Sequence, residues 1–248
     1  MKQPLTELVV LLPPIIVVIA SCIFDRLIGD PRWCPHPVQV MGAVIGQLRL
    51  WVEAICGDRP WALRLGGGLI TAVLVCGSAA AGWALEQLSQ STPWGVPLLV
   101  MALASALAGR SLRLAAEDVL KPLSSSPPDL KQARHKLGWI VGRDVDGLPA
   151  PELLRALAET ASENAVDGLF APLFWMLIGA GLWSLNPALP GPLALAWAFK
   201  ASSTLDSMLG YRSGRLRWLG TAGARLDDLL TWLPCRMVML TLPLVCPP

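Results

Sequence analysis

The sequence predicts an all-α protein: a polytopic integral membrane helix bundle with helical loops on the cytoplasmic side. Hydrophobic residues make up 54% of the 248 residues and charged residues only 15%. The mean hydropathy is +0.53, a value far from that of an ordinary soluble domain. The charged residues are also unevenly spread, leaving long uncharged stretches between them. Together these observations indicate a single integral-membrane domain over residues 1–248.

The uncharged stretches mark the expected spans, because a helix needs about 20 apolar residues to cross a bilayer. The stretch at 168–199 exceeds one span but is short for two spans and a turn. Asn-Pro at 186–187 and Pro-Gly-Pro at 190–192 predict a turn in its middle. We therefore favour two short or tilted helices, with a re-entrant hairpin as the alternative. The predicted spans lie near 8–24, 65–85, 94–109, 169–185 and 188–199, with the start of another at 237–248.

Lys and Arg alternate between rich and empty segments along the chain. Before and between the spans they number one, five, none, eight, none and six. The positive-inside rule predicts this alternation when the three rich segments, 26–64, 110–168 and 200–236, are cytoplasmic. Nearly all acidic residues lie in or directly beside these segments, Glu7 and Glu86 excepted. The functional site is therefore expected on the cytoplasmic side of the cell membrane, with the lipid bilayer around the spans.

Several classes of site are not expected. The six cysteines form no C-x-x-C pair and there are only two histidines, which argues against zinc and iron-sulfur sites. No basic stripe with interleaved aromatic residues is present, so nucleic acid is not expected as a partner. The phosphate-loop, dinucleotide and nucleophile-elbow motifs do not occur. The glycine run at 66–68 instead predicts close helix packing.

The first polar segment, "DRLIGDPRWCPHPVQVMG", runs from Asp25 to Gly42. Its three prolines exclude a regular helix, so we expect a rigid turned loop below the first span. Such a loop would hold Asp30 and His36 in fixed positions. The alternative is an ordinary loop at the membrane edge, with its arginines as topology signals.

The second segment contains "PAPELLRALAETASENAVDG", which predicts a helix that ends at Gly168. Glu159, Glu163 and Asp167 follow at i, i+4 and i+8 and would form one carboxylate stripe, with no Lys or Arg on that face. Oxygen ligands of this kind, with Asn164 beside them, suit Mg²⁺. A solvated helix face is the alternative, and for Glu159 it is at least as well supported.

The third segment, "KASSTLDSMLGYRSGRLRWLGTAGARLDDLLTWLPCR", covers residues 200–236. Lys200 emerges from an apolar helix, so it either extends to the membrane interface or holds a phosphate as a point charge. Arg143, in the glycine-containing turn of the second segment, is another candidate for a phosphate. The alternative is an interfacial helix with scattered ion pairs. The remaining candidates of the third segment are Asp206, Tyr211, Arg225, Asp227 and Asp228.

Five of these stretches are "DRLIGDPRWCPHPVQVMG", "IVGRD", "ASENAVDGLFAPLFW", "KASSTLDSMLGY" and "ARLDDLLTWLPCR". In this order they resemble the adenosylcobinamide-phosphate synthase family of cobalamin biosynthesis, and they cover most of 25–236. The resemblance implies an enzyme of the cytoplasmic membrane that joins adenosylcobyric acid, a corrinoid, to aminopropanol or its phosphate in an ATP-dependent reaction. It leaves open an association with other membrane enzymes of cobalamin assembly.

The implied chemistry is carbon-nitrogen (amide) bond formation by a ligase. ATP would convert a carboxylate into an acyl phosphate, and Mg²⁺ and cationic side chains would stabilise the transferred phosphoryl group. The individual roles below are our inference from this chemistry. The hypothesised metal ligands are Glu163, Asp167 and one of Asp227 or Asp228. The hypothesised phosphate and cofactor contacts are Lys200, Arg143, Arg225, Asp206 and Tyr211. The hypothesised catalytic residues are Asp30 or His36 as acceptor of the amine proton, with Glu163 and Asn164.

The family pattern continues into a stretch with His-Pro-Ser-Pro-Asn, whereas this sequence stops at Pro248. We therefore expect either a truncated sequence or one that has lost part of the site, and this puts the activity of the shortened chain in question. Two alternatives come from other classes: a membrane sensor or regulatory relative on the same scaffold, and a corrinoid transport protein. Transporters place ionisable groups near the bilayer midplane, whereas the charges here stay near one surface.

Overall fold

A computed structural model describes residues 13–29, 36–92 and 94–245, and all regular structure in these ranges is helical. The predicted fold class, an all-α polytopic membrane protein, is confirmed. Four helical stretches are long and apolar enough to cross a membrane: Pro37–Cys56, Pro60–Ser91, Gly95–Leu123 and Ala150–Leu185. The helices are α2 (Pro14–Leu27), α3 (Pro37–Cys56), α4 (Pro60–Ser91), α5 (Gly95–Ala104), α6 (Gly109–Leu123), α7 (Leu130–Leu137), α8 (Ala150–Ala165), the π-helical segment η1 (Val166–Phe170), α9 (Ala171–Leu185), α10 (Pro192–Leu209), α11 (Leu216–Leu219) and α12 (Thr221–Val245).

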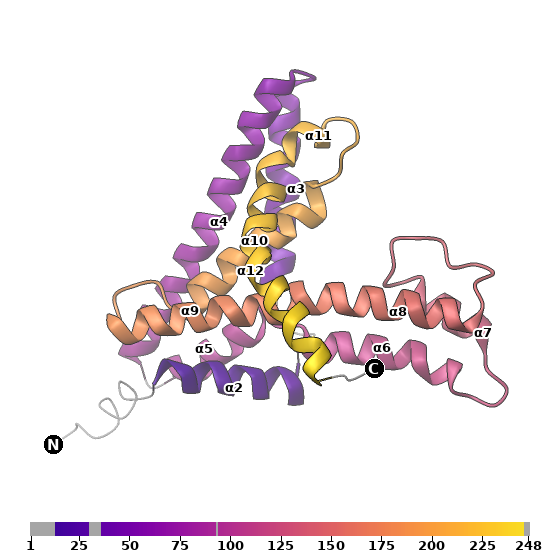
Figure 1. Cartoon of the computed structure of the whole chain (residues 1–248). Helices are drawn as coiled ribbons and strands as arrows, with labels where there is room; N and C mark the ends of the chain where they lie inside the picture. The colour runs from indigo at the N-terminus through magenta and orange to yellow at the C-terminus, as the bar shows by residue number, and fades with distance from the viewer. Residues whose placement is uncertain (1–12, 30–35, 93, 246–248) are drawn as a thin grey trace.

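The helices form two arms that meet at one end (Figure 1). One arm contains α3, α4, α10 and α12, and the other contains α2, α5, α6, α8 and α9. Helix α10 belongs to the core of both arms. Its first half, with Leu193, packs into the apolar cluster of α2, α5 and α9. Its second half, with Leu205, packs into the cluster of α3 and α4, and a third cluster joins α6, α7 and α8.

Where the two arms meet, a buried carboxylate on α4 binds the start of α10. Glu86, on the last turns of α4, is 0% exposed. Its Oε2 accepts a hydrogen bond from the main-chain N–H of Gly191 at 2.8 Å, and its Oε1 accepts from Leu193 at 2.6 Å. These donors belong to the start of α10, where main-chain N–H groups have no partner within the helix. The Lys- and Arg-free segments 86–94 and 186–192 therefore lie together.

The first polar segment is less irregular than predicted. Pro37 is the first residue of α3, a position where its missing N–H removes no helical hydrogen bond. The prediction of irregular chain as far as Gly42 is therefore wrong from Pro37 onward. The apolar helix α3, within the segment expected to be a loop, is the largest element that the predicted spans omit.

Gly168 does not end a helix, contrary to the prediction. The π-helical segment joins α8 to α9 without a break. The main-chain oxygen of Gly168 accepts a hydrogen bond from the N–H of Ala108 at 2.7 Å. A Cβ atom at Gly168 would lie 3.2 Å from the Cβ of Ala108. Glycine therefore allows the chain that enters α6 to approach closely without a shift of Ala108.

Other boundaries differ in smaller ways. The turn predicted within 168–199 is present, because α9 ends at Leu185 and α10 begins at Pro192. Helix α12 begins at Thr221, well before residue 237, where the last apolar stretch starts. Its first two turns carry Asp227 and Asp228, two of the predicted site residues.

Candidate functional site

A pocket of about 470 Å³ lies where α3, α6, η1 and α10 approach one another, and we call it the central pocket. It contains three of the predicted site residues, Asn164, Asp167 and Lys200. Its lining residues are Val38, Ala108, Ser111, Leu112, Ala115, Asn164, Asp167, Gly168, Lys200, Ser203, Thr204 and Ser207.

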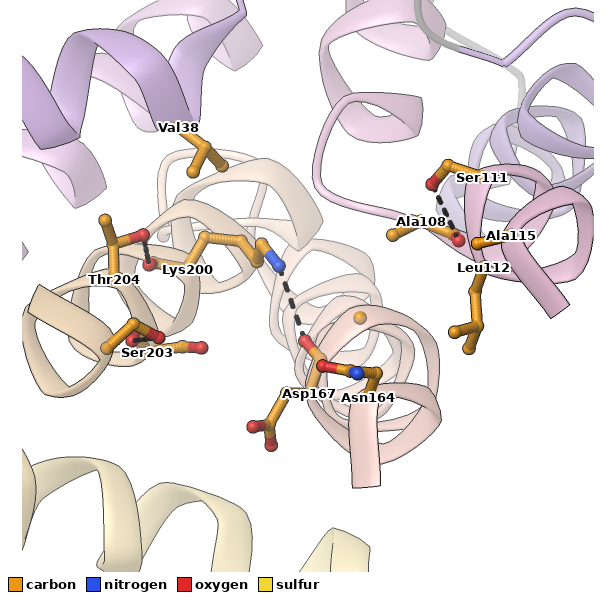
Figure 2. Close-up of a pocket in the computed structure, with 12 residues that line it drawn as sticks. Val38, Ala108, Ser111, Leu112, Ala115, Asn164, Asp167, Lys200, Ser203 and Thr204 are labelled. Atoms are coloured by element: carbon orange, nitrogen blue, oxygen red, sulfur yellow. Dashed lines mark hydrogen bonds between the residues drawn. The ribbon is translucent and has the colours of Figure 1, made fainter. Parts of the chain in front are cut away.

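Lys200 connects the two principal walls of the central pocket. Its side chain reaches from α10 toward the main chain of Asp167, and its Nζ donates to the Asp167 carbonyl oxygen at 3.4 Å (Figure 2). The Asp167 carboxylate is half-buried and within electrostatic range of Lys200, Glu163 and Asp206. An ammonium group thus lies at the pocket wall beside carboxylates from different elements.

Hydroxyl groups make the α10 wall polar. Ser203, Thr204 and Ser207 follow Lys200 at i+3, i+4 and i+7, so they share its face of the helix. Thr204 Oγ1 donates to the Lys200 carbonyl at 2.6 Å, and Ser207 Oγ donates to the Ser203 carbonyl at 2.9 Å. Because a hydroxyl has one donor and two acceptor sites, these oxygens can still accept hydrogen bonds from a ligand.

Asp227, on α12, is 9% exposed and lies within electrostatic range of Lys200 and Asp206 on α10. Its Oδ1 is buried and has no hydrogen-bond partner within the described parts of the chain. The same is true of Ser202 Oγ on α10 and Thr231 Oγ1, one turn further along α12. Buried polar atoms without partners are uncommon in folded proteins, so these three are candidates to bind an ion, a ligand or a water.

The pKa of Asp227 is raised to about 7, and burial is the largest cause. The carboxylates of Asp167, Asp206 and Asp228 contribute to the increase, and the Lys200 ammonium opposes it. The pKa of Asp206 is also raised, first by burial and then by Asp228. We call these four carboxylates, Asp167, Asp206, Asp227 and Asp228, the acidic seam.

The predicted Mg²⁺ ligands do not all lie together. Over the described ranges, no three His, Cys, Asp or Glu side chains converge closely enough to hold a metal ion. Mg²⁺ in nucleotide-dependent enzymes is commonly held by one or two carboxylates together with phosphate oxygens. Asp227, with its unpartnered buried oxygen, fits such a site, and so does Asp167. Their role as metal ligands, and those of Asp228 and Glu163, stay predictions.

Arg143 and Glu159 form an ion pair, with Arg143 Nη2 donating to Glu159 Oε2 at 2.8 Å. Arg155 Nε also contacts Glu159, at 3.2 Å. The prediction that the carboxylate stripe lacks a cation is therefore wrong for Glu159. Arg143 lines neither the central pocket nor the loop pocket described below, and Glu163 is exposed beside the pocket-lining Asn164.

His36 lies at the N-terminus of α3. The main-chain N–H of Val38 donates to His36 Nδ1 at 3.3 Å, so the imidazole caps the helix. Val38 itself lines the central pocket, which places His36 near its edge. Asp30 lies outside the described residues.

A second pocket, of about 530 Å³, lies beside the segment that joins α10 to α12, and we call it the loop pocket. The predicted residues Tyr211, Arg225 and Asp228 line it. Its complete lining is Arg64, Gly210, Tyr211, Arg212, Leu216, Arg217, Trp218, Gly220, Thr221, Ala224, Arg225 and Asp228. Six of the predicted site residues are thus divided between two pockets, and Asp206 and Asp227 of the acidic seam line neither of them.

Asp25 has a structural role that the sequence did not reveal. Its side chain is 5% exposed, and its Oδ2 accepts a hydrogen bond from the main-chain N–H of Arg110 at 3.3 Å. It therefore stabilises the start of α6, beside Ala108 at the wall of the central pocket. The two residues are separated by 85 positions, so sequence spacing gives no signal for this contact.

Comparison with known proteins gives one consistent result. The family model described as CobD/Cbib protein matches residues 18–246. The cobalamin biosynthesis protein CbiB of Salmonella choleraesuis is 40% identical over 232 residues, which is 91% of this chain and 68% of the relative. CobD of Klebsiella pneumoniae is 42% identical (90% of this chain, 66% of the relative), and CobD of Synechocystis is 39% identical (95% and 68%).

The chain thus spans about two thirds of the length of these relatives. No solved structure matches it. The matched region includes every site residue discussed above. The chain belongs to the CobD/CbiB family of cobalamin biosynthesis proteins.

Proposed function

We propose that the protein forms an amide bond in an ATP-dependent reaction that joins adenosylcobyric acid to aminopropanol or its phosphate. The observation that carries the proposal is the position of Lys200 at the central pocket, beside Asp167 and within electrostatic range of Asp227. Membership of a cobalamin biosynthesis family supports the choice of substrates.

The reaction requires the corrinoid carboxylate to lose an oxygen. ATP transfers its γ-phosphoryl group to that carboxylate, the amine attacks the acyl carbon, and phosphate and one proton leave. Mg²⁺, when bound, would supply charge neutralisation at the phosphates. Lys200 would hold a phosphate oxygen as a point charge, and Asp167 and Asp227 would hold the metal.

The remaining proposed roles concern the amine. It must be neutral when it attacks, and afterwards a nearby base must take its proton. His36, near the edge of the central pocket, and Asp30 are the proposed acceptors. Asn164 lines the pocket and would orient a substrate by hydrogen bonding.

The test is direct. The full-length protein in membranes is incubated with adenosylcobyric acid, aminopropanol phosphate and MgATP, and the product is sought by mass spectrometry. We expect the amide with the wild type and a loss of at least about 100-fold with Lys200→Met. The matched control is Lys121→Met, because Lys121 is exposed and pairs only loosely with Asp118, at 3.7 Å. Corrinoid binding without any amide would instead support a transport or binding protein.

A further inference from the structure

The loop pocket has an unusual excess of positive charge. Four arginines line it, Arg64, Arg212, Arg217 and Arg225, against one carboxylate in the same lining, Asp228. Within the described ranges none of these four arginines is in an ion pair. By contrast, Arg215, on the same connecting segment but not in the pocket lining, pairs with Asp58 at 2.7 Å and with Glu53 at 3.8 Å.

Trp218 holds two of these guanidinium groups in place. The Cζ of Arg64 lies 4.4 Å from the centre of a Trp218 ring, and the Cζ of Arg217 lies 4.9 Å from it. Arg64 comes from α4 and Arg217 from α11, so the stacking brings cations from distant parts of the chain to one cavity. A stacked guanidinium keeps its in-plane N–H groups available for an anion.

The walls of the loop pocket are closely packed main chain. A Cβ atom on Gly220 would lie 1.9 Å from the main-chain oxygen of Leu209 and 2.5 Å from its carbonyl carbon, so the end of α10 and the residue before α12 are in direct contact. Thr221 and Ala224 in the first turn of α12 also line the pocket. The positive end of that 25-residue helix adds to the attraction for an anion.

From these features we infer that the loop pocket binds the phosphate group of a phosphate ester, either a soluble ester or a lipid headgroup. A volume of about 530 Å³ leaves room for the esterified group as well as the phosphate. The inference deepens the proposed function, because it gives a phosphate-bearing substrate a place apart from the central pocket. It is tested by binding without turnover, so it can fail or hold independently of amide synthesis.

The first experiment uses the full chain in phosphatidylcholine nanodiscs, titrated with inorganic pyrophosphate in a calorimeter. We expect binding that Arg217→Gln and Arg225→Gln each weaken about tenfold or more. The matched control, Arg215→Gln, removes a charge that is already neutralised and is expected to change the affinity less than about twofold. All three side chains are exposed, so the variants are expected to fold.

The second experiment distinguishes the two sources of phosphate. The protein is released from mixed vesicles of phosphatidylglycerol and phosphatidylcholine, and retained lipids are identified by native mass spectrometry. Retention of phosphatidylglycerol that Arg217→Gln abolishes identifies a lipid headgroup; pyrophosphate binding without such retention identifies a soluble ester. The inference is overturned if neither ligand binds the wild type better than the pocket variants, or if Arg215→Gln weakens binding as much as they do.

Discussion

At the scale of single residues, the burial of Asp227 makes folding depend on pH. Its pKa in the folded protein is about 7, whereas an unfolded aspartate has a pKa of about 3.9. Between these values the folded state binds a proton that the unfolded state does not. The free energy of unfolding therefore falls as the pH rises from about 4 to about 7.

Asp227→Asn removes this titration. In EDTA, we expect the variant to have a thermal midpoint several degrees above that of the wild type at pH 8 and about the same midpoint at pH 4. The measurement is thermal unfolding of the detergent-solubilised protein across this range. Asp228→Asn, an exposed neighbour on the same helix, serves as the control and should show a smaller effect. An equal shift at both pH values would show that the amide acts through packing instead.

Glu163 tests the predicted metal site at a second residue. We expect Glu163→Gln to abolish amide synthesis while leaving the thermal midpoint within about 2 °C of the wild type, because the side chain is exposed. Glu159→Gln is the control: it breaks the pairs with Arg143 and Arg155 but should retain synthesis. Retained synthesis in Glu163→Gln would remove Glu163 from the site.

Some site residues could be predicted from the sequence and others could not. Lys200 stood out because a charge follows an apolar run. Ser203, Thr204 and Ser207 were not predicted as site residues, although their spacing from Lys200 places all four on one helix face. The Arg143–Glu159 pair was not visible, because it depends on how residues 141–149 fold back over α8.

At the scale of elements, Gly67, near the start of α4, packs against α11. A Cβ atom on Gly67 would lie 1.9 Å from the main-chain oxygen of Leu219, whereas one on Gly68 would meet no described atom within 4 Å. We expect Gly67→Ala to lower the free energy of unfolding by about 2 kcal/mol, and Gly68→Ala to leave it unchanged or raise it by up to about 1 kcal/mol. Unfolding in SDS titrations measures both. Equal effects of the two substitutions would contradict the close contact.

Glu86 stabilises the start of α10 through three main-chain N–H groups, those of Gly191, Leu193 and Ala194. Glu86→Gln replaces one acceptor oxygen with a donor and leaves a buried N–H unsatisfied, so we expect a loss of about 2 kcal/mol in the same titration. Gln90→Ala removes an exposed hydrogen bond one turn later on α4 and should cost less than about 0.5 kcal/mol. A negligible effect of Glu86→Gln would mean that the α10 start finds other acceptors.

The helices that consist largely of uncharged residues could be predicted from the sequence, whereas α3 could not. Arg49 and Glu53 place two charges within α3, so no uncharged stretch long enough for a span is found there. In the structure Arg49 Nε lies 2.7 Å from Glu53 Oε1, one helical turn away, so each charge partly neutralises the other. The start of α12 was missed for a similar reason, since its first turns carry two carboxylates of the acidic seam, Asp227 and Asp228.

At the scale of the whole molecule, the two segments without Lys or Arg meet at the joined end of the arms. Loops on one side of a membrane would be expected to lie together in this way. The prediction that 110–168 is cytoplasmic can be tested in a variant with serine at all six cysteines. We expect Asn186→Cys to react with a membrane-impermeant maleimide in intact cells, and Ser125→Cys to react only after permeabilisation. Labelling of both from outside would contradict the predicted topology.

The Glu86 contact has a mechanical consequence. Because it joins the last turns of α4 to the start of α10, any splaying of these two helices is smallest at that end and grows toward the other. The loop pocket, at the far end of α10, would then change shape more than the surroundings of Lys200, near the middle of that helix. A ligand that bridges α4 and α11 through Arg64 and Arg217 would restrain this motion where it is largest.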